Sequence, residues 1–150
     1  IEGLDGLRVD ERELTRFEPS YTVDTLAELR KELPDKSLCL IIGMDQFAAL
    51  DQWHEWRRIF DLAHVCVADR AMSDVRLSKP LEQLLASLAV EAPTQLHAQR
   101  SGHVFVGQMP RLDISSTRIR TLLAGGHDPR FLLPDSVLDI IGAEKIYDYQ

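Results

Sequence analysis

The stretch LCLIIG at residues 38–43 decides the fold. Five apolar residues in a row stop at a glycine, and this pattern predicts a β-strand that is buried on both faces, as in a parallel sheet. The runs HVCVA (64–68) and HVFVG (103–107) repeat the pattern along the chain. Residues Leu7–Val9 could form a further short strand. We therefore expect several strands of one sheet.

Helical patterns fill the intervals between these runs. Apolar residues recur at helical spacing in 20–33, after polar capping residues, and in 45–63, which can divide into two short helices. Further helices are predicted for 80–90, 115–126 and 134–145, with a polar loop at 69–79. Strands that alternate with helices indicate an α/β fold with a mostly parallel sheet and flanking helices. In such sheets ligands bind beyond the carboxyl ends of the strands.

Composition narrows the class of protein. A chain of 150 residues is most simply one domain, 1–150. The net charge of −7 argues against nucleic-acid or membrane-surface binding but leaves room for a small anionic ligand. Cys39 and Cys66 stand within apolar runs, which predicts buried, reduced thiols and a cytoplasmic protein. The histidines show no metal-ligand spacing with the cysteines, so no metal site is predicted.

The stretch DISSTRIRTLL (113–123) has two interpretations. Asp113 or Ser115 can simply cap a helix, with the neighbouring hydroxyls bonding early amides. The same first turn also carries a partial positive charge and unpaired N–H groups, so these hydroxyls and amides, with Arg118 and Arg120 within reach, could hold phosphate. This segment alone leaves both interpretations open.

Polar and aromatic residues follow two of the predicted strands. Gly43 and Asp45 could meet the ribose of a nucleotide, or merely end a strand and cap a helix. Trp53 and His54 could stack on a heteroaromatic ring, although an aromatic stripe on a helix is more often core. Arg70 stands where an anion contact would be suitable, although a lone arginine is usually only solvated.

Taken in order, these segments resemble bacterial nicotinate-nucleotide adenylyltransferases over nearly the whole chain. ISSTRIR is shared across the nucleotidylyltransferase superfamily, whereas SYTVDTL, GMD and LDQWHEW narrow the resemblance to the nicotinate-nucleotide branch. The resemblance implies a Rossmann-like nucleotidyltransferase fold. It extends over residues 7–26, 41–56, 63–70, 114–123 and 131–147.

The resemblance also implies an activity. The family transfers AMP from ATP to nicotinate mononucleotide in NAD biosynthesis, giving deamido-NAD and pyrophosphate, with Mg²⁺. By motif position, Trp53 would stack on the nicotinate ring beside His54, and Tyr21 and Thr22 would receive its carboxylate. The partners would be ATP and nicotinate mononucleotide, and a homo-oligomer is compatible with the sequence. Contacts to ATP would come from Ser115, Thr117, Arg120, Gly43, Asp45 and Arg70.

One departure from the family pattern is large. The family's G-x-F-D-P-x-H-x-G-H loop, whose histidines bind ATP phosphates, does not occur in these 150 residues. We therefore assign no catalytic residue, expect the N-terminal strand or strands of the fold to be missing, and expect the chain alone to be inactive. Two alternatives stay open: a non-catalytic nucleotide-binding relative, and an adenylyltransferase for nicotinamide mononucleotide.

Overall fold

A computed structural model describes residues 5–69, 75–110, 112 and 114–148 of the chain. The chain divides into two compact units, Ile1–Pro110 and Arg111–Gln150, and each is described by itself. The expectation of a single domain stays a prediction.

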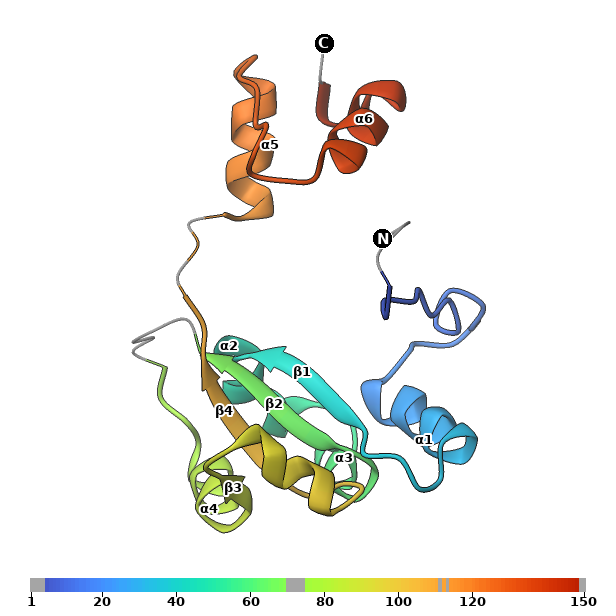
Figure 1. The fold of residues 1–150 in the computed structure, drawn as a ribbon, viewed down its shortest axis with the longest axis vertical. Helices are drawn as coiled ribbons and strands as arrows, with labels where there is room; N and C mark the ends of the chain where they lie inside the picture. The colour runs from blue at the N-terminus through green and yellow to red at the C-terminus, as the bar shows by residue number, and fades with distance from the viewer. Residues whose placement is uncertain (1–4, 70–74, 111, 113, 149–150) are drawn as a thin grey trace. The chain divides into compact units, whose positions relative to one another are not determined.

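The first unit contains a four-stranded sheet in the order β1-β2-β4-β3, and every pair of neighbouring strands is parallel (Figure 1). This confirms the predicted α/β fold with a parallel sheet and flanking helices. Its elements in chain order are α1 (Thr22–Glu32), β1 (Cys39–Gly43), α2 (Met44–Ala48), the 3₁₀ helices η1 (Leu50–Gln52) and η2 (Trp56–Arg58), α3 (Ile59–Leu62), β2 (His64–Asp69), α4 (Lys79–Leu88), β3 (Ala89–Val90), the 3₁₀ helix η3 (Pro93–Ala98) and β4 (Val104–Gln108).

Two local predictions differ from the structure, and two short elements were not predicted. The segment 45–63 forms four short helical pieces, because Trp53 is extended and Glu55 takes a left-handed conformation with φ of 46°. Leu7–Val9 is not a strand, and Leu7 and Val9 are largely exposed. The two-residue strand β3 and the helix η3 follow α4 without a pattern long enough to predict them.

The main core lies on one face of the sheet, where α2 and α3 pack (Figure 1). Val65, Val67 and Val104 project into it from the strands and are at most 2% exposed. On β1 the residues alternate, so Leu40 and Ile42 pack against this core while Ile41 is 74% exposed. The prediction that this strand is buried on both faces is therefore wrong. β1 is an edge strand of the described sheet.

His64 is a completely buried polar residue at the start of β2. Its Nδ1 accepts a hydrogen bond of 3.0 Å from the backbone N–H of His103, so the ring proton resides on Nε2, which lies 3.0 Å from the carbonyl of Gln99. Both ring nitrogens thus have partners in the neutral form, and His64 ties residues 99–103 to the sheet. Within the described ranges, no group of three or more His, Cys, Asp and Glu side chains could hold a metal ion.

The two cysteines are free thiols on neighbouring strands, but the prediction that both are buried is wrong. Cys39 is exposed and Cys66 is half-buried. Burial, followed by the nearby Cys39 thiol, raises the pKa of Cys66 to about 11. The thiol form of Cys66 is therefore favoured in the folded protein, and its thiolate becomes abundant only as the pH approaches that value.

We expect iodoacetamide to alkylate Cys39 before Cys66 at pH 8. The thiolate is the reacting species, Cys39 is exposed, and the raised pKa of Cys66 keeps its thiolate scarce at this pH. The rate at Cys66 should keep rising about tenfold for each pH unit up to about pH 10. Peptide mass spectrometry at several pH values measures both rates, and C39S serves as the control for the influence of Cys39. A Cys66 rate that levels off below pH 9 would contradict the environment described.

The second unit consists of α5 (Ser116–Ala124), α6 (Asp135–Ala143) and the 3₁₀ helix η4 (Ile146–Asp148). Its small core joins Ile119 and Leu123 of α5 to Leu138 and Ile141 of α6. As predicted, α5 ends at glycines: Gly125 is its C-cap, and Gly126 follows with φ of +70°, which suits glycine. Across both units, no described helix combines the length and apolar character needed to cross a membrane.

Candidate nucleotide-binding site

The N-terminus of α1 has no side-chain cap. Its N-cap residue is Tyr21, which has an extended backbone and makes no side-chain hydrogen bond to the first turn. The polar cap expected from the sequence is therefore not formed, and Thr22 becomes the first helical residue. The first amides of a helix have no intrahelical partner and carry its partial positive charge. The amides that precede Asp24 could bind an anionic group, whereas the Asp24 N–H already donates to the carbonyl of Tyr21 and its carboxylate adds a negative charge to this turn.

Tyr21 and His54 come together although they are far apart in the sequence. Their ring centroids lie 4.4 Å apart and the rings are tilted by 34°. Tyr21 reaches this position from the start of α1, whereas His54 lies in the turn between η1 and η2. The ring of His54 therefore lies beside the N-cap residue of α1, while a common ligand pocket for the two residues stays a prediction.

The two tryptophans of this region have different environments. Trp56 is only 9% exposed and makes an edge contact with the ring of Phe60. Trp53, directly before His54, is half-buried, so one part of its ring packs on the core and the remainder is accessible. Because residues 53–55 leave the helix, the helical spacing predicted for 45–63 does not relate Trp53 to Trp56. Trp56 is a core residue, and Trp53 remains the candidate for stacking.

The turn that carries Trp53 and His54 is anchored on both sides. On one side, Asp51 of η1 accepts a hydrogen bond of 2.7 Å from Ser78 Oγ, which holds the pKa of Asp51 below its ordinary value. On the other side, Glu55 accepts a hydrogen bond of 2.7 Å from Arg58, which likewise lowers the pKa of Glu55. These contacts limit the movement of the turn between them.

Gly43 and Asp45 lie at the carboxyl end of β1. Gly43 is the N-cap of α2, and Asp45 is an exposed residue of its first turn rather than the cap. A Cβ atom at position 43 would lie 2.5 Å from Asp45 Oδ1, so the glycine lets this carboxylate fold back over the strand end. Gly43, Ala68 and Gly107 are in register across three strands, so this row carries no side chain larger than a methyl group, although the Phe105 ring lies close to Gly107.

The ATP residues predicted from ISSTRIR belong to the second unit. Ser115 is the N-cap of α5, and its hydroxyl accepts a hydrogen bond of 3.2 Å from the backbone N–H of Arg118. This confirms the capping interpretation, while phosphate binding stays a prediction. Thr117 and Arg120 are exposed, and the Arg120 guanidinium lies 5.9 Å from the ring centre of Tyr147. Arg70 and Asp113 lie outside the described residues.

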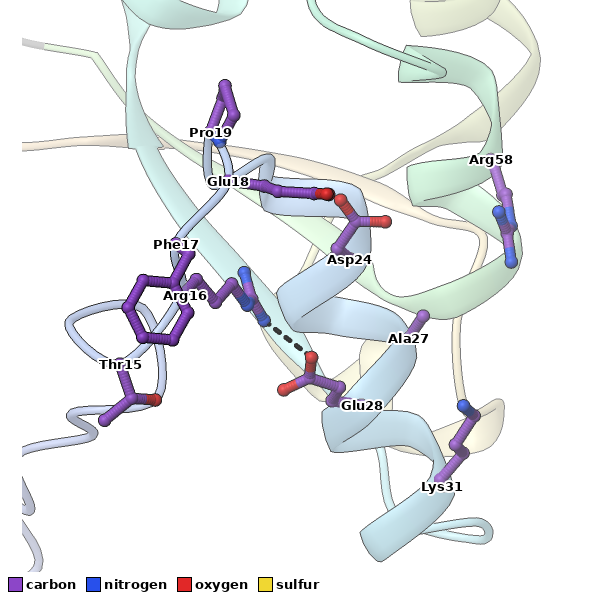
Figure 2. A pocket seen from close by; sticks show the side chains of 10 residues that line it. All are labelled: Thr15, Arg16, Phe17, Glu18, Pro19, Asp24, Ala27, Glu28, Lys31 and Arg58. Carbon is purple, nitrogen blue, oxygen red and sulfur yellow. Dashed lines mark hydrogen bonds and ion pairs between the residues drawn. The ribbon is translucent and has the colours of Figure 1, made fainter.

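The sequence did not predict a surface cavity of about 610 Å³ beside α1. Figure 2 shows Arg16 within it, hydrogen-bonded to Glu28 of α1. The contact joins residues twelve positions apart, and no local sequence pattern predicts it. The cavity is lined by Thr15, Arg16, Phe17, Glu18, Pro19, Asp24, Ala27, Glu28, Lys31 and Arg58.

Relatives with known names resemble the chain over most of its length. A "probable nicotinate-nucleotide adenylyltransferase" of Methylococcus capsulatus is 45% identical over 95% of this chain and 68% of the relative. One of the same name from Aeromonas salmonicida is 44% identical over 95% of this chain and 66% of the relative. The chain therefore spans about two thirds of the length of these curated relatives.

A solved structure shows the same fold. Nicotinic acid mononucleotide adenylyltransferase of Plasmodium falciparum matches with a TM-score of 0.60 over 89% of this chain and 61% of the solved chain, at 15% identity. The model of the cytidylyltransferase-like family matches residues 2–122. The fold is thus the Rossmann-like nucleotidyltransferase fold. The chain belongs to the cytidylyltransferase-like family and, within it, to the nicotinate-nucleotide adenylyltransferases, which are transferases.

Proposed function

We propose that the protein represented by this chain transfers AMP from ATP to nicotinate mononucleotide and releases pyrophosphate. A phosphate oxygen of the mononucleotide attacks the α-phosphorus of ATP, the bond to the β-phosphate oxygen breaks, and deamido-NAD forms. The observation that carries the proposal is the Tyr21–His54 ring contact of 4.4 Å at the uncapped start of α1. It combines aromatic surface with an anion site, as a pyridine carboxylate requires.

The nicotinate end of the substrate fits these residues in two ways. The accessible part of the Trp53 ring offers a stacking surface, with His54 next to it in the chain. The carboxylate would accept hydrogen bonds from first-turn amides of α1 near Tyr21 and Thr22, at the positive end of the helix. An uncharged amide would gain less from this end of the helix, so the geometry favours the acid over nicotinamide mononucleotide.

Residues of each unit, taken separately, are proposed to contact ATP. Gly43 and Asp45 at the end of β1, together with Arg70, would line the nucleotide. Ser115, Thr117 and Arg120 would bind phosphate oxygens through hydroxyls and a guanidinium. No residue of this chain is assigned to proton transfer or to transition-state stabilisation by histidine, so we propose that the chain alone turns over very slowly.

Mg²⁺ would enter with ATP. This ion is commonly held by substrate phosphates and water with only one or two carboxylates, so it does not require a three-residue protein cluster. The described ranges hold no such cluster, and we assign no residue to the ion. A cytoplasmic location is proposed because the free thiols Cys39 and Cys66 suit a reducing compartment.

Calorimetry on the chain tests the proposal. We expect nicotinate mononucleotide to bind about tenfold more tightly than nicotinamide mononucleotide, which is the size of a favourable charge interaction at a helix end. A coupled assay for deamido-NAD should show negligible turnover by the chain alone. Equal affinities for acid and amide would refute the proposed carboxylate site. Binding of ATP without any binding of nicotinate mononucleotide would favour a different nucleotide-binding function.

A further inference from the structure

The segment that delivers Tyr21 to the pocket has no regular structure of its own. Residues 5–20 form only turns and irregular backbone before α1 begins. Their large apolar side chains do not hold them in place, since Leu14 and Phe17 are more than four-fifths exposed. Polar contacts with α1 must therefore fix the path of this segment.

Arg16 makes the contacts closest to Tyr21. Its Nη1 donates a hydrogen bond of 2.9 Å to Thr25 Oγ1. Its Nη2 donates one of 2.8 Å to Glu28 Oε1, which Figure 2 shows as a dashed line. The Arg16 side chain is 18% exposed. Thr25 and Glu28 are three positions apart and so lie on one face of α1. Arg16 thus spans the first two turns of the helix from outside.

Thr25 connects Arg16 to Tyr21. Its hydroxyl accepts from Arg16 and donates to Glu13, while its backbone N–H donates to the carbonyl of Tyr21 over 3.3 Å. The chain of contacts therefore runs from Arg16 through Thr25 to Tyr21, whose ring meets His54. Between Arg16 and Tyr21, residues 17–20 are all exposed. Their path is defined by the two anchored ends.

We infer that Arg16 is a positioning residue that holds the Tyr21 ring against His54 by fixing the segment before α1. Arg16 touches no proposed substrate atom, and its effect on nicotinate mononucleotide rests on the proposed function. The Tyr21–His54 ring contact does not depend on the proposed function. Without Arg16, residues 17–21 lose one anchored end, and the Tyr21–His54 pair becomes one of several arrangements. The apparent substrate affinity is then multiplied by the fraction of molecules that keep the pair, so it falls as that fraction falls.

Arg12 provides a matched control on the same segment. It pairs with Asp10 and, at 3.2 Å, with Glu32 in the last turn of α1. Its longer contact, 3.6 Å, is with Glu28. Arg12 has the same exposed fraction, 18%, as Arg16, but within the described part of the chain it makes no hydrogen bond to Thr25. Loss of Arg12 therefore loosens the segment farther from Tyr21.

The test is the proton NMR shift of the His54 ring in the full 150-residue chain, because a ring 4.4 Å away shifts these protons. Tyr21→Ala defines the shift when the contact is lost. We expect R16A to move the His54 signals more than half of the way to that value, R16K to restore part of the shift, and R12A to leave it near the wild-type value. We also expect R16A to weaken nicotinate mononucleotide binding about fivefold in calorimetry.

Unchanged His54 signals in a folded R16A chain would overturn the inference, as would an equal change in R12A. If R16A does not fold, as judged by circular dichroism, Thr25→Val tests the Arg16–Thr25 link, since it removes this acceptor, together with the donor to Glu13, and leaves the Arg16–Glu28 pair. The signals are recorded without ligand, so they remain decisive if the proposed function fails. Failure of the proposed function would be seen separately, because Y21A would then bind nicotinate mononucleotide as tightly as the wild type.

Discussion

Replacement of Trp53 by leucine is expected to weaken nicotinate mononucleotide binding by about tenfold to a hundredfold, since stacking of a base on an aromatic side chain contributes about 1–3 kcal/mol. Leucine keeps an apolar side chain where Trp53 packs against the core, so the fold should survive. It removes the flat ring surface on which a pyridine could stack. Calorimetry with the purified W53L chain measures the loss, and thermal unfolding shows how much stability is retained.

Trp56 is the matched control, three residues along the same segment. It is 9% exposed and packs against Phe60, so W56L should lower stability and leave affinity for the folded molecules nearly unchanged. The two variants therefore separate binding from packing. If W53L binds nicotinate mononucleotide as tightly as the wild type, Trp53 does not stack on the substrate. If W56L alone loses binding, the assignment of the two tryptophans must be exchanged.

The strands were predictable from the sequence because their signal is local. LCLIIG, HVCVA and HVFVG each became a strand within one residue of the expected bounds. The exposure of Ile41 and Cys39 was not predictable in this way, because it depends on which strands become neighbours. An apolar run looks the same at an edge as at the centre of a sheet. The run in β1 identified a strand but could not reveal that one of its faces lacks a cover in the described structure.

The candidate site shows the same division between local and long-range information. Ser115 was recognised as a helix cap because a hydroxyl at the start of an apolar helical pattern is a local signal. The break in the helix before Trp56 depends on Glu55, a residue without a strong preference for the left-handed conformation. The contact of Arg16 with Thr25 depends on the packing of an irregular segment, so its role could not be predicted.

Replacement of Arg30 by alanine is expected to lower the free energy of unfolding by about 3 kcal/mol, the size of a mutation that breaks a partly buried hydrogen-bond network. The guanidinium donates to five backbone carbonyls at the C-terminal end of α1, at the end of α3 and before β4. Loss of solvation lowers the pKa of Arg30, followed by repulsion from Arg100. Urea unfolding followed by circular dichroism measures the change. The acceptors are Leu33, Pro34, Lys36, Leu62 and Arg100.

Lys31→Ala is the control, because Lys31 is the next residue of α1 and is exposed. Arginine, lysine and alanine all favour helices, so neither substitution acts mainly through helix propensity, and K31A should change stability by less than about 0.5 kcal/mol. R30K should recover part of the loss, since an ammonium group carries the charge but cannot reach carbonyls on several sides as a planar guanidinium does. If R30A costs no more than K31A, water satisfies these carbonyls as well as Arg30 does. The ends of α1 and α3 would then be joined by apolar packing alone.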